Sequence, residues 1–355
     1  MQSIDLFSRV AASWRQLPTI ARGDQARVRV GLSGGLDSTV LLHLLASLRP
    51  VLGFALAATH VRHGLVAGSE AWADGCRTLC EALDVPFSVC DVEVERRHPG
   101  GLEAAARAAR RAALLGLGDD WLVLAHHRDD QAETVLFRAI RGAGVRGAAG
   151  MRACVPGDGE AGLWRPLLDV PRADLLAYAE AHSLDWIDDP SNADSRFSRN
   201  FLRNDVLPIV EARFPGASKG FARLGRLCGE ASGMLDELAV IDLAALTRTG
   251  STHLHRDAAL GLSSPRLRNL MRHMLSEAGE SMPDEDRLRE LERQFRHDEA
   301  AAGLRLPFGA VAICVYRDFC WLEPLGGEQA PASVTWNGEL AVAWAGGRVS
   351  FALTV

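Results

Sequence analysis

The feature that most constrains the fold is a Gly-Gly turn placed directly between an apolar strand and an amphipathic helix. Residues 28–32 form a short apolar run, the string Ser-Gly-Gly-Leu-Asp-Ser occupies residues 33–38, and residues 38–48 carry an apolar stripe at helical spacing. A strand followed by a helix buries its apolar face by pairing with further strands under a layer of helices. The turn therefore predicts a sheet built from βαβ units.

The first 140 residues repeat this alternation four times. Strands are expected at 28–32, 54–61, 87–94 and 121–125, and helices at 38–48, 69–83, 102–115 and 130–141. This rhythm predicts an α/β fold, a parallel five-stranded sheet with helices on both faces. Ligands of such sheets bind beyond the carboxyl ends of the strands, so the loops after these strands are where a functional site is expected.

The remainder of the chain has a different pattern, which predicts further domains. After residue 165 the sequence turns helical and polar, with one long helix expected over 216–250 and two more over 264–277 and 283–296. At 355 residues the chain exceeds the usual size of one hydrophobic core. We expect an N-terminal domain over residues 1–215, a mostly helical middle domain over 216–325 and a short β-rich segment over 326–355. That last segment is expected to be a C-terminal domain that is either naturally trimmed or truncated.

Composition excludes several classes of protein. The seven cysteines form no CxxC pair, so neither a disulfide framework nor a zinc site is indicated. No apolar run is long enough for a membrane span or a signal peptide, so a cytoplasmic protein without a membrane partner is expected. The net charge of −6 argues weakly against a nucleic-acid partner, but the local distribution of charge decides that question.

The turn at residues 33–38 has the chemistry of a phosphate site. Adjacent glycines let the backbone approach a ligand, and the first amide groups of a helix point toward an anion at its N-terminus. The rival interpretation is a plain turn in which Asp37 or Ser38 caps the helix. The chain's only lysine is Lys219, which excludes the lysine-dependent P-loop pattern. The predicted nucleotide-binding residues are Ser33, Gly34, Gly35, Leu36, Asp37 and Ser38.

The complete string resembles the PP-loop of the ATP pyrophosphatases, which cleave ATP between its α- and β-phosphates. The resemblance implies a Rossmann-like PP-loop domain that uses ATP and Mg²⁺. Asp37 is the expected magnesium ligand in this loop, because Mg²⁺ is held by one or two carboxylates together with substrate phosphates.

Two other segments resemble the same family. The string at residues 60–64 is similar to the family's HVxHG segment, which implies that His60 lies near the adenine and ribose, although Arg62 stands where the family commonly has Asn. The alternative is that His60 simply ends a strand. The helix at 101–111 is similar to the family's ExxAR segment, which implies that Arg107 reaches the ATP phosphates. A solvated face with Glu103 and Arg107 as an ion pair is the alternative.

After the fourth strand, several ionisable side chains are crowded into one turn. The string from His126 to Thr134 resembles the family motif HHxDDQxET. Asp130 followed by Glu133 also has the spacing of a helix-capping pair, a purely structural explanation. The resemblance implies that Asp130 and His127 hold magnesium–ATP or the amine of an amino acid. The predicted catalytic set is Asp37, Asp130, His127 and Arg107, with Asp37 and Asp130 as the magnesium ligands.

Residues 191–203 are similar to the signature SNxDxxYxRNxIR of the tRNA(Ile)-lysidine synthetases, with Phe197 and Leu202 as conservative departures. Between Arg196 and Arg226 the chain has seven basic and two acidic residues. A basic stretch interleaved with phenylalanines suits phosphates and unstacked bases. The predicted tRNA-binding residues are Arg196, Arg199, Arg203, Arg223 and Arg226.

The resemblance implies a ligase that forms a C–N bond. Such an enzyme joins free L-lysine to C2 of the wobble cytidine of a tRNA(Ile) with the anticodon CAU, through an adenylated tRNA intermediate, and releases AMP and pyrophosphate. A homodimer is a further expectation. The alternatives are a PP-loop tRNA thiolase, or another adenylating enzyme that modifies tRNA, and a nucleotide-binding module without catalysis. A thiolase needs paired cysteines, and Cys76 and Cys80 are expected to be ordinary core residues.

Overall fold

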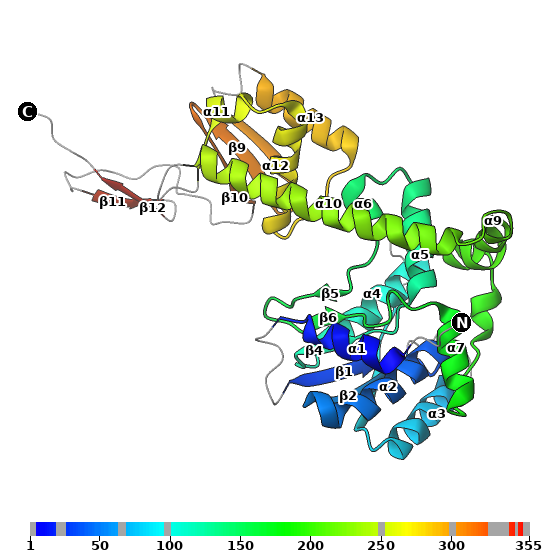
Figure 1. Cartoon of the computed structure of the whole chain (residues 1–355). Coiled ribbons are helices and arrows are strands. Elements are labelled where there is room, and N and C mark those ends of the chain that lie inside the picture. Colours follow the sequence, from blue (N-terminus) through cyan, green and yellow to red (C-terminus); the bar gives the residue numbers. More distant parts are fainter. Residues whose placement is uncertain are drawn as a thin grey trace, which may run out of the picture. The chain divides into compact units, whose positions relative to one another are not determined.

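The computed structural model describes residues 5–18, 26–62, 69–95, 101–247, 253–297, 303–325, 341–344 and 347–350 (Figure 1). The chain divides into two compact units, residues 1–232 and 233–355. The boundary between the units falls inside helix α10 (Ala217–Leu246). The domain boundaries expected at residues 215 and 325 stay a prediction.

A six-stranded sheet forms the centre of the first unit. Its order is β3-β2-β1-β4-β6-β5, and all neighbours pair in parallel except β5 and β6. The prediction of a parallel sheet is confirmed, but the count of five strands is wrong. Neither β5 nor β6 lies in an expected strand range, because two and three residues are too few to give a recognisable apolar run. The strands are β1 (Arg27–Gly31), β2 (Ala55–Arg62), β3 (Phe87–Asp91), β4 (Trp121–Val123), β5 (Cys154–Val155) and β6 (Gly162–Trp164).

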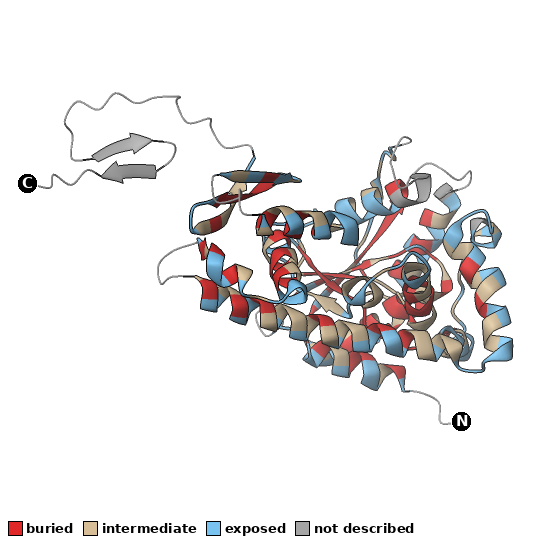
Figure 2. Cartoon of the chain, turned by 90° about the horizontal axis from the view of Figure 1, so that it is seen from above, coloured by how far each residue is buried: buried red, intermediate tan, exposed pale blue. Residues whose placement is uncertain are grey.

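Helices cover both faces of this sheet, as predicted. Along β4, Trp121 and Val123 belong to the larger hydrophobic core, whereas Leu122 belongs to a smaller core on the opposite face, beside Leu114. This alternation follows from the two-residue period of a strand, and Figure 2 shows buried residues along the central strands. The helices are α1 (Leu6–Arg15), α2 (Leu36–Leu52), α3 (Ser69–Ala82), α4 (Gly101–Leu115), α5 (Arg128–Ile140) and α7 (Arg172–Ala181).

The strand order creates a switch point beside β1. The chain proceeds from β1 to β2 and β3 on one side and then returns to place β4 on the other side of β1. Val30 of β1 is in register with Val123 of β4, so the loops that follow these two strands start side by side. Crevices at such a switch point are where α/β sheets bind ligands.

The remaining elements of the first unit are short helices and the start of one long helix. A short helix α6 (Val145–Ala148) follows α5. Beyond α7 come η2 (Pro190–Ala193), α8 (Ser198–Phe201), the π-helical turn η3 (Leu202–Val206), α9 (Leu207–Arg213) and then α10. A π-helical turn re-aims the side chains of a helix and is often associated with function.

The second unit combines helices with a small antiparallel sheet of order β7-β10-β9-β8. The helix predicted over 264–277 is α12 (Ser264–Glu277). Residues 326–340 of the predicted β-rich segment lie outside the described residues. Within the described ranges, every helix is too short or too polar to cross a membrane. The other elements are α11 (Arg256–Leu260), α13 (Glu285–Arg296), β7 (Leu254–His255), β8 (Leu304–Phe308), β9 (Val311–Tyr316), β10 (Phe319–Pro324) and the hairpin β11 (Ala341–Trp344) and β12 (Gly347–Ser350).

Candidate active site

The loop between β1 and α2 depends on Gly34 for its shape. Gly34 has a φ of +85°, which strains any residue with a side chain. A Cβ atom at this position would also lie 3.0 Å from Cδ1 of Ile187 and 3.1 Å from Sγ of Cys76. The carbonyl of Gly34 accepts a hydrogen bond from the amide of Ile187 at 2.9 Å. The segment after α7 therefore fixes this loop in place.

The start of α2 offers hydrogen-bond donors to an anion. Its N-cap is Gly35, and no described side chain caps the helix, so neither Asp37 nor Ser38 plays that structural role. The hydroxyl oxygens of Ser33 and Ser38 lie 3.0 Å apart at the same turn, and Ser38 donates to the carbonyl of Gly35 at 3.0 Å. Uncapped amides, the positive end of the helix dipole and two hydroxyl groups fit the oxygens of a phosphate chain.

Asp37 carries a carboxylate that the described residues only partly satisfy. Its Oδ2 lies 3.5 Å from Nε2 of His127, whereas its buried Oδ1 accepts no hydrogen bond from the described residues. Nε of Arg172 lies 3.9 Å from that Oδ1. A buried carboxylate oxygen of this kind fits a cation. In the described part of the chain, no three His, Cys, Asp or Glu side chains form a metal cage, so substrate oxygens would supply most ligands of a magnesium ion.

His127 and Asp130 form the N-terminal cap of α5. The Nδ1 atom of His127 accepts from the amides of Asp129 and Asp130, at 3.2 and 3.4 Å, and Asp130 accepts from the amide of His127 at 3.0 Å. The helix thus starts at Arg128, two residues earlier than predicted, and its capping pair is His127 with Asp130 rather than the alternative of Asp130 with Glu133. A histidine as N-cap is rare, so the usual sequence signals for a helix start do not find it.

The cap also joins α5 to the phosphate loop. Because Nδ1 of His127 accepts, its proton lies on Nε2, which faces Asp37 at 3.5 Å and Asp130 at 3.4 Å. Burial alone would lower the pKa of His127, but the bond to Asp37 and the charges of Asp130, Asp37 and Asp129 raise it. Burial likewise opposes the charge of Asp130, yet His127, His126 and Arg203 hold its pKa below the usual value.

Arg203 lies in the π-helical turn η3 and binds two carboxylates in the first turns of α5. Its guanidinium donates to both carboxylate oxygens of Glu133, at 2.6 and 3.0 Å, and to Oδ1 of Asp130 at 2.8 Å. Glu133 is 1% exposed, and its burial raises its pKa despite the opposing charge of Arg203. Asp130 and Glu133, which share Arg203, therefore have pKa values shifted in opposite directions. Such a pair of carboxylates often marks acid–base chemistry.

Two predicted nucleotide contacts have partners within the protein. His60, at the end of β2, is buried, and its Nδ1 donates to the carbonyl of Leu32 at 2.9 Å, just before the phosphate loop. Burial lowers its pKa, although that hydrogen bond opposes the effect. Arg107 of α4 is exposed, and its guanidinium lies 3.0 Å from Nε2 of His126. The side chain of Glu103 lies outside the described residues. The roles of His60 and Arg107 in binding ATP stay predictions.

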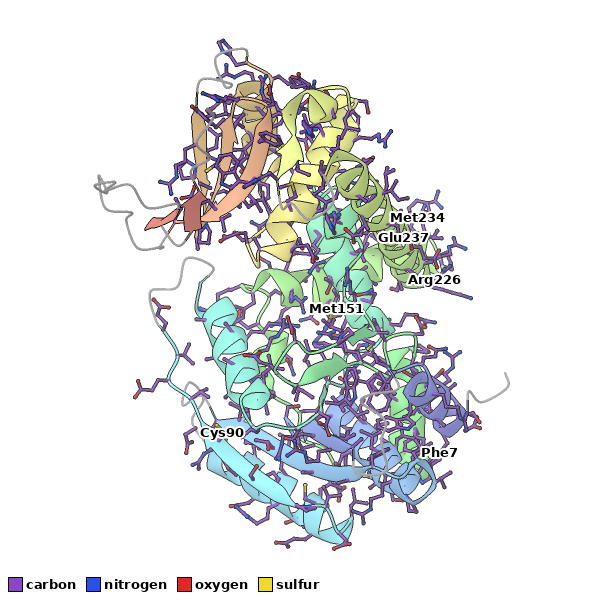
Figure 3. The ribbon with its side chains drawn as sticks, turned by 90° about the vertical axis from the view of Figure 1, so that its left-hand side faces the viewer. Phe7, Cys90, Met151, Arg226, Met234 and Glu237 are labelled. Atoms are coloured by element: carbon purple, nitrogen blue, oxygen red, sulfur yellow. The ribbon has the colours of Figure 1, made fainter. Side chains whose placement is uncertain are left out.

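The predicted tRNA-binding arginines fall in three different environments. Arg203 and Arg199 face α5, where Arg199 donates to the hydroxyl of Thr134 at 2.8 Å. Arg196 is exposed and pairs with Asp194. Arg223 and Arg226 are exposed on α10, where Arg226 pairs with Glu230 one turn along the helix (Figure 3). Of the five arginines, only Arg223 and Arg226 lie on the exposed surface of the long helix α10.

Sequence reasoning overlooked three residues of this site. The sequence indicates Glu133 only as an alternative capping partner of Asp130 and His126 only as part of a crowded turn, and it assigns Arg172 no role. The structure places Arg172 beside Asp37, and its amide donates to Asp129 at 2.8 Å. Pro171 marks the start of α7, but no local signal indicates that Arg172 lies beside Asp37. No local signal indicates that Glu133 would meet Arg203, since 70 residues separate them.

The dual role of Asp130 leads to a first prediction. In Asp130→Asn the amide oxygen can still accept from the backbone amide of His127, so the hydrogen bond that Asp130 contributes to the start of α5 is kept. The charge opposite Arg203 and His127 is lost, however. We expect a folded protein whose melting temperature falls by a few degrees and whose turnover falls by about 10²-fold or more. Thermal unfolding and steady-state rates on the same preparation test this, and an active but unstable variant would favour a capping role alone.

The fold and the loop after β1 define a class of protein. Residues 9–210 match the PP-loop domain family and residues 254–321 match the TilS substrate binding domain. In structural comparison, the first unit's fold is shared with the U34-tRNA thiolase NcsA from Methanococcus maripaludis, with a TM-score of 0.52 and 21% identity, over 63% of this chain and 79% of that one. The chain is therefore a PP-loop protein.

Curated relatives narrow the class to one family. The chain is 49% identical to the tRNA(Ile)-lysidine synthase of Aromatoleum aromaticum over 335 residues, which are 94% of this chain and 78% of that protein. It is 45% identical to the enzyme of the same name from Azoarcus sp., covering 73% of its length, and 48% identical to that of Pseudomonas fluorescens, covering 60%. The chain belongs to the tRNA(Ile)-lysidine synthase family.

Proposed function

We propose that this protein joins free L-lysine to C2 of the wobble cytidine of a tRNA(Ile) with the anticodon CAU, at the expense of ATP. One observation supports this most: the phosphate loop after β1 and the acidic start of α5 meet at His127, whose Nε2 lies 3.5 Å from Asp37 and 3.4 Å from Asp130. A site for a phosphate chain and a site for a cationic amine are thus contiguous. That arrangement suits an enzyme that activates one substrate and then adds an amine to it.

In the first step, the C2 carbonyl oxygen of cytosine attacks the α-phosphorus of ATP, and pyrophosphate leaves. The uncapped amides of α2 and the hydroxyls of Ser33 and Ser38 would hold the phosphates, with Arg107 as a further cation. Magnesium bound at Asp37 would neutralise charge on the phosphate oxygens. The protein contributes positioning and charge stabilisation, which are most of what a phosphoryl-group transfer needs.

In the second step, the ε-amine of lysine attacks C2 and the adenylate oxygen leaves with AMP. The amine is nucleophilic only after it loses a proton, so a base must stand close to it. Asp130 and His127 are the candidates from the sequence. The structure adds Glu133 beside Asp130: burial raises the pKa of Glu133, while Arg203 opposes that shift. Both oxygens of Glu133 accept from Arg203 and the residue is 1% exposed, so Glu133 positions Arg203 beside Asp130 rather than meeting the amine itself.

The cysteines favour a lysidine synthase over a thiolase. Cys76 and Cys80, on α3, are both buried. Burial and the neighbouring Cys80 raise the pKa of Cys76 to about 12, and burial and Glu81 raise that of Cys80 to about 11. A sulfur carrier needs a thiolate near neutral pH, which this environment suppresses. Replacing both cysteines with alanine should leave tRNA modification intact if the protein is a lysidine synthase.

The proposed tRNA path gives a second prediction. In Arg223→Gln/Arg226→Gln, tRNA affinity should fall by a similar factor for cognate and non-cognate tRNAs, because these arginines would contact phosphates. The slope of log Kd against log salt should flatten by roughly one unit per lost contact. Arg223 should account for more of the change, since Glu230 offsets the charge of Arg226. Arg9→Gln, on the exposed face of α1, is the control, and an equal loss in the control would refute the assigned path.

Omitting one substrate at a time tests the proposed reaction. Continuous release of AMP and pyrophosphate should need ATP, tRNA and lysine together, whereas ATP and tRNA without lysine should release pyrophosphate only once per enzyme, as the adenylated tRNA accumulates. Release that needs no tRNA would contradict the proposal, and a lack of any release would favour a nucleotide-binding module. A cytoplasmic location and a homodimer are parts of the same proposal.

A further inference from the structure

The antiparallel sheet of the second unit has two faces of different composition. Side chains alternate along a strand, so each strand contributes to both faces. One face packs against α12 and α13, and the strand residues that share this hydrophobic core are Leu254, Leu306, Ile313, Val315 and Cys320. The residues between them point to the opposite side of the sheet, which we call the outer face.

The outer face carries aromatic rings from three neighbouring strands. Phe319 of β10 is in register with His255 of β7 and with Tyr316 of β9, and residues paired in this way lie on the same face. The ring centroids of Phe319 and His255 lie 4.9 Å apart. Two residues along β10, the ring centroid of Trp321 lies 5.0 Å from that of His253, which in turn lies 6.4 Å from that of Phe319. The rings therefore form one continuous surface.

This surface remains accessible to a ligand. Tyr316 is 50% exposed, whereas Phe319 and Trp321 are half-buried. Phe295, an aromatic residue of the core on the other face, is 2% exposed. Cross-strand ring pairs do stabilise a sheet, but β-branched side chains would also suit the strands and would leave less apolar area in water. A contiguous group of exposed rings indicates a binding surface.

The charged residues around the rings balance one another. Arg305 of β8 pairs with Glu323 of β10 at 3.3 Å. At the exposed turn between β9 and β10, Arg317 and Asp318 contribute one charge of each sign. The guanidinium of Arg317 lies 5.2 Å from the ring centroid of Tyr316, so this cation borders the rings. Two positive and two negative charges suit a flat, weakly polar ligand better than a run of backbone phosphates.

Nucleobases have this chemistry. Sequence-specific RNA recognition often uses a four-stranded antiparallel sheet whose exposed aromatic side chains stack on unpaired bases. Residues 254–321, which match the TilS substrate binding domain, include all of these rings except His253. We propose that the outer face stacks unpaired nucleotides of the substrate tRNA, with Phe319 and Trp321 as the platforms. This inference rests on the proposed function, which makes a tRNA the substrate.

Removing the rings without removing charge tests the proposal. In Phe319→Leu/Trp321→Leu, tRNA affinity should fall by about tenfold for each lost ring, or about 10²-fold together. The slope of log Kd against log salt should not change, because no phosphate contact is lost. In Phe319→Tyr/Trp321→Phe, which keeps both rings, affinity should stay within about threefold of wild type. Phe7→Leu is the control, since Phe7 is a half-buried ring of α1 with no predicted role.

The RNA itself provides a further control. A fully paired RNA duplex should bind the wild type and the leucine variant equally. If a tRNA without its unpaired 3′ end also binds both equally, the stacked nucleotide belongs to that end, and a persisting difference assigns it to a loop.

Several results would overturn the proposal. These are equal tRNA affinity in the leucine and ring-retaining variants, a loss that flattens the salt slope, and a loss of self-association with unchanged tRNA affinity. If the double leucine variant does not fold, Trp321→Leu alone replaces it, with an expected loss of about tenfold. Wild-type protein that binds no tRNA would instead refute the proposed function.

Discussion

Asp37→Asn is expected to lower turnover by about 10²–10³-fold while leaving the protein folded and tRNA affinity nearly unchanged. The magnitude is that of removing one preorganised electrostatic group from a reaction centre. The reason lies in the environment of the carboxylate: Oδ1 is buried, accepts no hydrogen bond from the described residues and lies 3.9 Å from Arg172. A cation bound with the phosphates would use this oxygen, and an amide oxygen is a poor substitute for it.

Stability separates this account from a structural role for Asp37. Asparagine retains an oxygen that can accept from Nε2 of His127, and it removes a half-buried negative charge whose Oδ1 has no hydrogen bond from the described residues. The melting temperature should therefore be unchanged or slightly higher. Asp158→Asn, on the exposed loop before β6, serves as the control for loss of one negative charge. Near-normal turnover in Asp37→Asn, measured at saturating ATP and magnesium, would remove Asp37 from the reaction centre.

Arg203→Met is expected to reduce both stability and turnover. Without the guanidinium, Glu133 remains 1% exposed and loses its charged partner. Removing one member of a fully buried ion pair costs roughly 3–5 kcal/mol, and the 38% exposure of the Arg203 side chain reduces the expected loss to about 2 kcal/mol in the free energy of unfolding. Turnover should fall even at saturating tRNA, because Asp130 loses its bond from the same arginine.

A second substitution distinguishes the two effects. In Arg203→Met/Glu133→Gln no uncompensated carboxylate is left at Glu133, so much of the lost stability should return while turnover stays low. Arg9→Met is the matched control, since Arg9 is exposed on α1 and has no predicted role at the site. Chemical denaturation, turnover and tRNA affinity are measured on all three variants. A large loss of tRNA affinity in Arg203→Met with unchanged stability would show that Arg203 serves the tRNA directly.

The parallel sheet, the phosphate loop and the long helix could be predicted because each has a local signal. The loop at residues 33–38 combines two glycines with a preceding apolar strand, and the helix at 264–277 has a regular apolar stripe. Strands β5 and β6 could not be located, because two and three residues carry no clear periodicity. The four strand ranges that the sequence indicates therefore end at β4, and the six strands of the sheet exceed the five expected.

The partners of the predicted site residues were harder to foresee. The cap of α5 uses His127, a residue outside the usual capping set, so the helix start was misplaced by two residues. Arg203 was assigned to tRNA because it lies in a basic stretch, yet a π-helical turn directs it to Glu133 and Asp130. Contacts across 70 residues depend on the tertiary fold and leave no trace in a local pattern.

One measurement tests the proposed reaction most directly. Purified protein is incubated with ATP, magnesium, L-lysine and unmodified tRNA(Ile) with the anticodon CAU, and the tRNA is digested to nucleosides for mass analysis. We predict that one cytidine is replaced by a nucleoside heavier by one lysine less one water, and only when both ATP and lysine are present. An unchanged set of nucleosides, or a sulfur-containing product when a sulfur donor is added, would contradict the assignment.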